Sequence, residues 1–298
     1  MIASRANPKI KQARALRQRK EREATGLFIV EGITHVAAAI EAGAQVEYIC
    51  YAPGLLTSAF AHELLEHQAA RGLPSYPTTP EAFQSLSEKD NPVGILAVVR
   101  QRRWTLESLT PKAFQFGVAL VSPQDPGNIG AILRTMDAVG ASGLLLLDGG
   151  ADAYHPNAVR ASMGALFIKP VAPATFDHFA RWARQHGYRV IGTSAHACAD
   201  YRAAHYALPL ILLFGSEQKG LSPEQIALCD ETVHLPMLGK VGSLNLAVAA
   251  GVMLYEVIRE NVRRQDDPGN RSHRRGTHPH RPGDPAGAKP GDGRRYGG

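Results

Sequence analysis

The sequence has no long hydrophobic run and no apolar leader. None of the apolar stretches in its 298 residues approaches the length needed to cross a bilayer. Met1 to Arg5 are followed by further charged residues and not by the apolar core of a signal peptide. We therefore expect a cytoplasmic protein with no membrane segment.

Cysteine is scarce. Cys50, Cys198 and Cys229 are far apart and form no Cys-x-x-Cys pair, which argues against a zinc site or a redox pair and predicts buried free thiols. His62 and His67 resemble a metalloprotease signature, but they are five residues apart, whereas two ligands on one helical face are four apart. We expect no bound metal.

The common nucleotide-binding fingerprints are also missing. No Gly-x-Gly-x-x-Gly follows an expected strand, no Gly-x-x-x-x-Gly-Lys-Ser/Thr is present, and the glycines of Leu147-Asp148-Gly149-Gly150 are too few. These absences argue against a Rossmann-type dinucleotide site.

Positive charge, by contrast, is concentrated at the two ends of the chain. The net charge is +6, residues 1–23 contribute +6, residues 265–298 contribute +3, and the middle is therefore negative. Clustered cations favour a polyanion such as RNA, because binding releases counterions from phosphates. A solvated charged helix with a solubilising tail explains the charge equally well.

The first part of the chain predicts a small α/β domain over residues 1–105. We expect a basic helix over 8–23, strands over 27–30, 46–51 and 94–99, and a helix over 35–42. Polar residues then mark a linker over 106–115.

A second alternation of strands and helices predicts a parallel sheet covered on both faces, in a domain over residues 116–264. The expected strands are 118–121, 144–147, 189–192 and 210–214, and helices are expected from Asn128, over 176–186 and over 244–262. Residues 265–298 have almost no aliphatic side chains, so we expect a disordered tail.

Three loops of this second domain carry polar groups. In the first, Asn128 is suited to cap a helix, Gly130 permits close backbone approach, and Arg134 follows nearly two turns later. These groups follow a strand, where open α/β sheets bind ligands. An ordinary turn with a surface arginine is the alternative.

The second loop, Phe214 to Gly220, places Glu217 between two glycines. Such a loop has exposed backbone amides and one carboxylate for a hydroxyl or a cation, although a plain turn with a solvated glutamate has the same pattern. In the third, Ser243 is expected to cap the last helix, which leaves Asn245 in its unsatisfied first turn. Capping explains the serine, but not an asparagine between two leucines.

In this order, the motifs Asn-x-Gly-x-x-x-Arg, Gly-x-Glu-x-x-Gly and Pro-Met-x-Gly-x-x-x-Ser-Leu-Asn resemble the signatures of the SpoU/TrmH family of RNA 2′-O-ribose methyltransferases, in the SPOUT superfamily. Arg160 to Gly164 is similar to the family's Arg-x-Ser-x-Gly segment. Residues 7–11 with 28–32 are similar to a substrate-binding domain that is related to a ribosomal-protein RNA-binding fold.

The resemblance implies a methyl donor, S-adenosylmethionine, bent into a trefoil knot, and a homodimer in which Arg134 reaches across to the partner. It implies catalytic roles for Arg134, Asn128, Glu217, Ser243 and Asn245. It implies cofactor contacts from Phe214, Gly215, Gly220, Leu235, Pro236, Met237 and Leu244. For RNA contacts we expect Arg5, Lys9, Lys11, Arg14 and Arg160.

A guanidinium is hard to deprotonate, so we interpret Arg134 as a clamp on ribose or phosphate and not as a base. The fused front domain favours ribosomal RNA as the substrate. Transfer RNA is one alternative, and a non-catalytic RNA-binding assembly protein is another.

Overall fold

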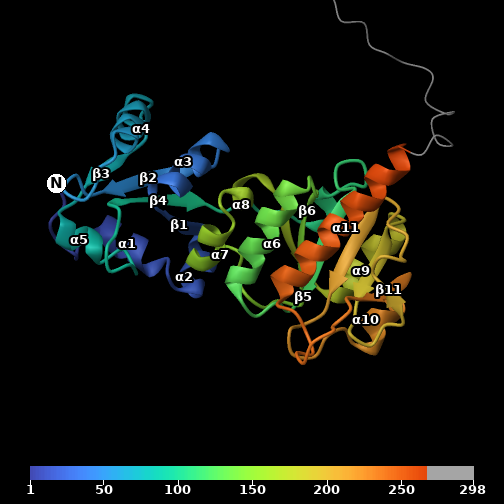
Figure 1. Ribbon diagram of the computed structural model, residues 1–298. Coiled ribbons are helices and arrows are strands. Elements are labelled where there is room, and N and C mark those ends of the chain that lie inside the picture. The colour runs from blue at the N-terminus through green and yellow to red at the C-terminus, as the bar shows by residue number, and fades with distance from the viewer. Residues whose placement is uncertain (267–298) are drawn as a thin grey trace, which may run out of the picture. The chain divides into compact units, whose positions relative to one another are not determined.

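The computed structural model describes residues 1–266, with the side chains described as far as residue 263, and contains two β-sheets (Figure 1). The first sheet has the strand order β1-β4-β2-β3 and the second the order β7-β6-β5-β10-β8-β11-β9. The predicted α/β class with a parallel sheet is confirmed. The domain boundaries at 105 and 116 stay predictions.

The first sheet lies between two layers of helices. β4 pairs antiparallel with both β1 and β2, and β2 pairs parallel with β3. Apolar residues of α1 and α5 pack on one face, and those of α3 and α4 pack on the other. The elements in chain order are α1 (Pro8–Ala15), α2 (Arg19–Thr25), β1 (Leu27–Glu31), α3 (Ile33–Glu41), β2 (Val46–Tyr51), α4 (Ala59–Ala70), β3 (Ser75–Pro77), α5 (Pro80–Gln84) and β4 (Ile95–Arg100).

The single basic helix expected over 8–23 is wrong, because the chain breaks between α1 and α2. Leu16 ends α1 and is buried in the core, and Gln18 has an extended backbone. Arg22 turns back and donates hydrogen bonds to the carbonyl oxygens of Leu16 (2.9 Å) and Arg17 (2.6 Å). These bonds satisfy carbonyls that a continuous helix would have used itself.

All neighbouring strands of the second sheet pair in parallel. The carboxyl ends of its strands therefore lie along one edge. β10 lies between β5 and β8, so loops far apart in the sequence become neighbours there. Its elements are β5 (Phe116–Val121), α6 (Pro126–Ala138), β6 (Gly143–Leu147), α7 (Pro156–Ala161), α8 (Ala165–Ile168), β7 (Val171–Ala174), α9 (Phe176–Gln185), β8 (Arg189–Thr193), β9 (Ala199–Asp200), β10 (Leu210–Phe214), α10 (Pro223–Leu228), β11 (Glu231–His234) and α11 (Leu246–Asp266).

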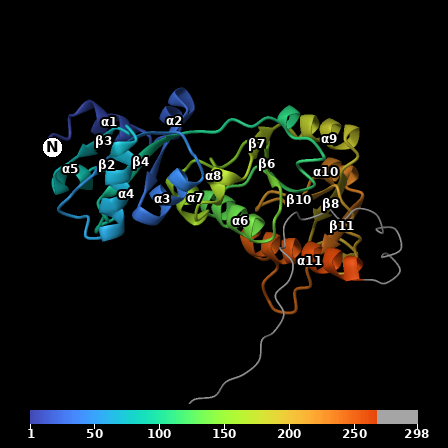
Figure 2. The same cartoon turned by 90° about the horizontal axis from the view of Figure 1, so that it is seen from above.

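Alternate residues of each central strand face opposite helix layers (Figure 2). Val118 and Leu120 of β5 share a core with α6 and α11. Ala119 and Val121 share a core with α9 and α10. This burial on both faces accounts for the continuous apolar strands.

The expected linker, 106–115, is packed and not free. It contains a short 3-10 helix (Leu106–Ser108), and Leu106, Leu109 and Phe114 are buried in the core beneath α9. The chain therefore crosses to the second sheet with apolar contacts along the way.

The closing helix is longer than predicted. Because α11 extends to Asp266, the first two residues of the expected tail are helical, and residues 267–298 lie outside the described residues. No helix of residues 1–266 is long and apolar enough to cross a membrane. In the same range no cluster of three or more His, Cys, Asp or Glu is placed to hold a metal ion.

The prediction of buried thiols is only partly right. Cys50 is buried, Cys229 is half-buried and Cys198 is exposed. Cys198 follows β8 in a surface turn, a position that composition alone did not reveal.

Candidate active site

The first polar loop begins helix α6, and Asp125 caps it in place of the predicted Asn128. The Asp125 side chain accepts a hydrogen bond from the backbone amide of Gly127 (2.8 Å), and Pro126 occupies the first helical position. Asn128 lies in the first turn, where its side chain points inward and is only 8% exposed. Its amide is therefore available for a contact with another loop.

Gly130 permits the predicted close backbone approach, and the element that approaches it is another helix. A Cβ atom at this position would lie 2.3 Å from the carbonyl oxygen of Ala158 in α7. The glycine thus lets α7 pack directly against α6.

The second loop follows β10 and is closed on itself. A Cβ on Gly215 would lie 2.1 Å from the backbone of Gly220, and Gly220 has a positive φ of 65°. The backbone amides of Ser216, Lys219 and Gly220 are bonded within the loop, so the expectation that its amides are exposed is wrong for these three. The tight closure holds Glu217 at the rim.

Glu217 joins the second loop to the first. One carboxylate oxygen accepts a hydrogen bond from the side-chain amide of Asn128 (2.6 Å), and the other accepts one from the backbone amide of Gln124 (2.8 Å). Hydrogen bonds to a carboxylate are stronger than those between neutral groups. The loops after β5 and β10 are therefore held together at the carboxyl edge of the sheet.

Asn128 also joins the third loop. Its side-chain oxygen accepts a hydrogen bond from the side-chain amide of Asn245 (3.0 Å). Glu217, Asn128 and Asn245 thus form one chain of hydrogen bonds, which we call the three-loop network. Residues from three distant parts of the sequence converge there.

Asn245, and not Ser243, caps α11. The Asn245 side-chain oxygen accepts hydrogen bonds from the backbone amides of Ala247 (2.9 Å) and Val248 (3.3 Å). Ser243 lies in the preceding loop with its side chain exposed. The asparagine between two leucines is therefore explained by two simultaneous duties, the cap and the network.

The third loop leaves its backbone free. Within residues 1–266 no hydrogen bond engages the backbone of Pro236 to Leu244. Leu238 is 99% exposed and Leu244 is 39% exposed. This segment thus offers polar backbone groups and uncovered apolar side chains beside the three-loop network, whereas Phe214 is buried beneath it.

Arg134 lies apart from the three-loop network. It is exposed on α6, and six residues of helix place it roughly 9 Å along the axis from Asn128 and turned by about 120°. No hydrogen bond or ion pair of Arg134 occurs within the described residues. Its predicted role as a clamp therefore stays a prediction.

The five residues predicted to contact RNA differ in their exposure and in their contacts within the protein. Arg5, Lys11 and Arg14 are exposed, and Arg160 is exposed on α7, where it donates a hydrogen bond to Asn157 (3.1 Å). Lys9 instead lies with its ammonium 4.5 Å from the ring centre of Tyr48, a cation–π contact. The positive charge of Lys9 is therefore partly engaged by an interaction within the protein.

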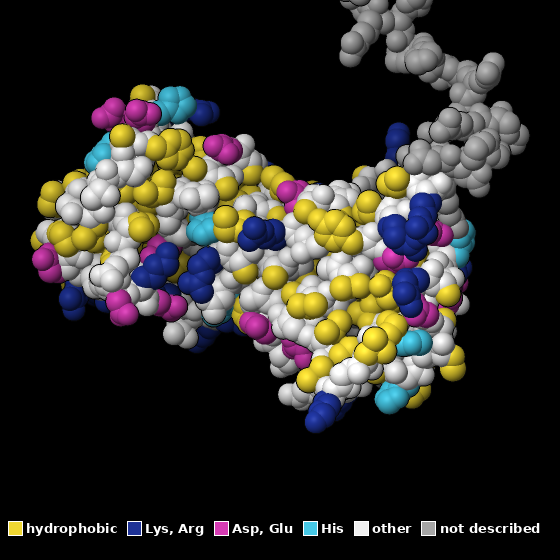
Figure 3. Space-filling view, in the orientation of Figure 1, with side chains coloured by type: hydrophobic (Ala, Val, Ile, Leu, Met, Phe, Trp, Pro, Cys, Tyr) yellow, Lys and Arg dark blue, Asp and Glu magenta, His cyan; other side chains and the backbone are white. Residues whose placement is uncertain are grey.

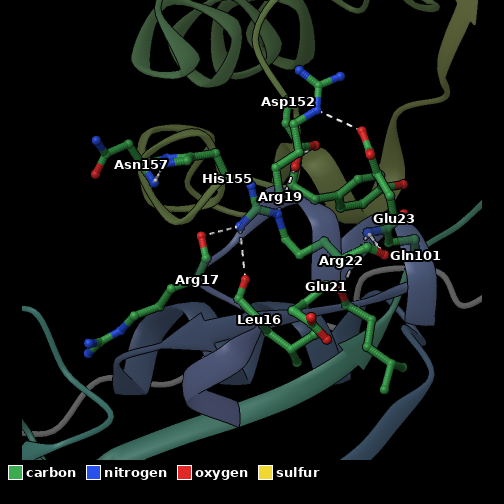
Figure 4. Close-up of polar contacts among 12 residues, drawn as sticks. Leu16, Arg17, Arg19, Glu21, Arg22, Glu23, Gln101, Asp152, His155 and Asn157 are labelled. Carbon is green, nitrogen blue, oxygen red and sulfur yellow. Dashed lines mark hydrogen bonds and ion pairs between the residues drawn. The ribbon is translucent and has the colours of Figure 1, made fainter. Parts of the chain in front are cut away.

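Arg22 has a structural role that the sequence did not predict. Its side chain is 1% exposed and its Nε donates to the Asp152 carboxylate (2.7 Å), which joins α2 to the loop after β6 (Figure 4). It is one of eight basic residues in 1–23, and nothing in the sequence distinguishes it from its solvated neighbours. We call this pair with its carbonyl contacts the Arg22 junction.

Comparison with known proteins matches both parts of the chain. The model of the SpoU rRNA Methylase family matches residues 115–255, and that of the MRM3-like substrate binding domain matches residues 7–97. A 23S rRNA (uridine(2479)-2′-O)-methyltransferase of Streptomyces viridochromogenes is 34% identical over 88% of this chain and 92% of its own length. The chain belongs to the SpoU rRNA methylase family.

Two further relatives extend the comparison. A 23S rRNA (guanosine(2553)-2′-O)-methyltransferase of Bacillus subtilis is 28% identical, over 86% of this chain and 98% of its own. The AdoMet-bound rRNA methyltransferase of Sinorhizobium meliloti has a TM-score of 0.79 and 34% identity, covering 87% of this chain and 97% of its own. The predicted family is confirmed. The relatives differ in the base they are named for, so the family does not specify the target nucleotide.

Proposed function

We propose that this protein transfers a methyl group from S-adenosylmethionine to a ribose 2′-hydroxyl of large-subunit ribosomal RNA. The observation that carries the proposal is the three-loop network, which brings the three family motifs together at the carboxyl edge of the parallel sheet. That edge is where open α/β sheets bind their ligands.

The residues around the network fit the methyl donor. The free backbone groups of 236–244 can hydrogen-bond the edge of an adenine or a carboxylate, and the uncovered Leu238 and Leu244 can cover its apolar parts. Gly215, Gly220, Leu235, Pro236 and Met237 would complete this wall. When bound, the donor supplies an activated methyl group.

The protein's part in the reaction is alignment, because the displacement is in-line. Asn128, Glu217 and Asn245 hold the loops at fixed separations, and Ser243 presents an exposed hydroxyl in the third loop. Arg134 would clamp the ribose or its phosphate and stabilise the developing oxyanion. Arg134→Lys keeps the charge but loses the paired donors, so we expect at least a tenfold loss of kcat/KM, and retained turnover would contradict the clamp.

Arg134 is supplied by a second copy of the chain in this proposal. The face of α11 beside α6 is apolar and uncovered, since Val248 is 52% and Tyr255 is 58% exposed, and hydrophobic side chains gather there in Figure 3. Exposed apolar surface of this kind favours association. A homodimer through α6 and α11 covers it and carries Arg134 toward the partner.

A mixing experiment tests the shared site. Arg134→Ala and Asn128→Ala should each be inactive. Exchange of subunits between the two variants forms heterodimers in which one of the two sites is intact. About one quarter of the wild-type activity should therefore return. Mixing Arg134→Ala with Glu217→Ala should restore activity equally. No recovery in either mixture, despite exchange shown by mass spectrometry, would contradict an arginine supplied by the partner.

The RNA substrate is identified by mapping 2′-O-methylation in cells with and without the gene. Loss of one site in large-subunit RNA is expected. Loss in transfer RNA would change the substrate, and no loss anywhere, together with no calorimetric uptake of S-adenosylmethionine, would favour an assembly factor. The trefoil knot, the cytoplasmic location and the independence from metal stay predictions.

A further inference from the structure

A polar cavity lies away from the three-loop network. Its volume is about 190 Å³, and it opens between the first sheet, α3 and helix α7 of the second domain. Lys, Arg and His side chains lie around α7 in Figure 3. The lining residues that carry polar groups are Glu31, His35, Glu88, Lys89, Asn157 and Arg160.

The two carboxylates of this cavity are already engaged. Glu31 accepts a hydrogen bond from the Ser87 hydroxyl (2.6 Å) and lies 3.9 Å from the Lys89 ammonium. Glu88 lies 3.8 Å from Nε of Arg17. The Arg160 guanidinium, by contrast, makes one hydrogen bond, to the neutral Asn157. Two cations and two carboxylates line the cavity, but Glu31 is bonded to Ser87 and Glu88 is paired with Arg17, which lies outside the lining, so Arg160 is the charge with the least internal compensation.

His35 lines the same cavity and is affected by its two cations. Its Nδ1 is buried and has no hydrogen-bond partner among the described residues. Burial, followed by the charges of Lys89 and Arg160, lowers the pKa of His35, while Glu31 opposes this with a smaller effect. An imidazole with an unused nitrogen thus lies beside the cations Lys89 and Arg160, an arrangement that an anionic acceptor would satisfy.

We propose that this cavity binds a phosphodiester group of the substrate RNA, held by Arg160, Lys89 and His35. The inference rests on the proposed function, which supplies a structured RNA as the ligand. Asn157 and Arg160 come from α7, whereas His35 and Lys89 come from the first domain. One phosphate would therefore bind both domains and fix the RNA to each of them.

The role is one of positioning, because the cavity lies apart from the motif loops. Its loss should raise KM for RNA and leave kcat at saturating RNA nearly unchanged. A bound phosphate also favours protonated His35, so RNA affinity should fall as pH rises through the pKa of the occupied site. The charged groups facing His35 are Glu31, Lys89 and Arg160.

The test compares Lys89→Gln and Arg160→Gln with Lys112→Gln and Arg184→Gln, two exposed cations outside the cavity. Binding to an unmodified large-subunit RNA transcript is measured across salt concentrations. Each cavity variant should bind about tenfold more weakly, and its slope of log K against log salt should shrink by about 0.7 to 0.9. The control variants should change both quantities much less. Cavity variants that match the controls would overturn the proposal, provided that calorimetry shows S-adenosylmethionine binding as in the wild type.

A second measurement identifies the source of the anion. The His35 imidazole is followed by NMR with a short RNA oligonucleotide and, separately, with inorganic phosphate at equal ionic strength. RNA should raise the His35 pKa in the wild type and not in Arg160→Gln. A response to inorganic phosphate alone would indicate a free-anion site and overturn the RNA assignment. If the wild type transfers no methyl group to any RNA, the proposed function fails, while the salt slopes still decide what the cavity binds.

Discussion

At the residue scale, Glu217 shows why a carboxylate is needed at the centre of the network. Both of its oxygens accept hydrogen bonds, one from the Asn128 amide and one from the Gln124 backbone. A glutamine of the same shape has one oxygen and one NH₂ group, so one of the two donors would face another donor.

We therefore expect Glu217→Gln to lower kcat/KM by about 10- to 100-fold, the effect of one lost charge-assisted hydrogen bond and one unsatisfied donor. Steady-state kinetics on the RNA transcript provide the measurement. Glu224→Gln, at an exposed glutamate in the first turn of α10, is the matched control. Equal activity of the two variants would show that the carboxylate does not hold the loops.

The cysteines give a second prediction at this scale. Burial raises the pKa of Cys50 to about 12 and that of Cys229 to about 11, so both thiols stay protonated at pH 8. Only the thiolate reacts with alkylating agents. Iodoacetamide at pH 8 should therefore modify the exposed Cys198 first, as shown by peptide mass spectrometry, and the two other thiols should follow only on unfolding or as pH rises toward 11. Faster modification of Cys50 would contradict its burial.

At the element scale, the start of α11 combines a helix cap with a site contact. The Asn245 oxygen caps the helix, and its NH₂ group donates to Asn128. A substitution that preserves the oxygen and removes the donor separates these two duties.

Asn245→Asp keeps a good capping residue, so the free energy of unfolding should change by less than about 1 kcal/mol, while activity falls because the Asn128 oxygen loses its donor. Asn245→Ala should lose activity and also about 1 kcal/mol of stability. Ser243→Ala should leave stability unchanged, because that serine does not cap the helix. Urea unfolding measures the stability of all three variants. A destabilised Ser243→Ala protein would indicate that the serine caps the helix.

At the scale of the whole described chain, the Arg22 junction joins α2 to the loop after β6 of the second sheet. Arg22 is buried and its partner Asp152 is 16% exposed, and the same guanidinium satisfies two carbonyls at the break between α1 and α2. Removing one member of such a pair leaves the other charge buried and unpaired.

Arg22→Ala should therefore lower the free energy of unfolding by about 3 to 5 kcal/mol, as measured by chemical denaturation. Lys20→Ala, at an exposed cation two residues away, should change it by less than about 0.5 kcal/mol. A small effect of Arg22→Ala would mean that water enters the junction and solvates Asp152.

The sequence by itself determined the family and the longer apolar strands, whereas the short strands β3, β7, β9 and β11 were not predicted, and the roles of the site residues stay predictions. Apolar strands such as 46–51 and 210–214 are local patterns, and three spaced motifs are read along the chain without knowledge of distance. Local patterning also placed α3, α6, α9 and α11 to within a few residues, since helix periodicity depends on neighbours three and four positions apart. It did not predict α4, α5, α7, α8 or α10, and it joined α1 and α2 into one helix.

Only the tertiary structure decided what each of those residues does. Asn128 and Ser243 were both expected to cap helices, yet Asp125 and Asn245 do so, because Asn128 is drawn inward by Glu217 from another loop. In the sequence Arg22 is one of several basic residues, and only its burial against Asp152 shows its structural role. Hydrogen bonds between residues about 90 to 130 positions apart depend on how the strands are ordered in the sheet, and no local pattern encodes that order.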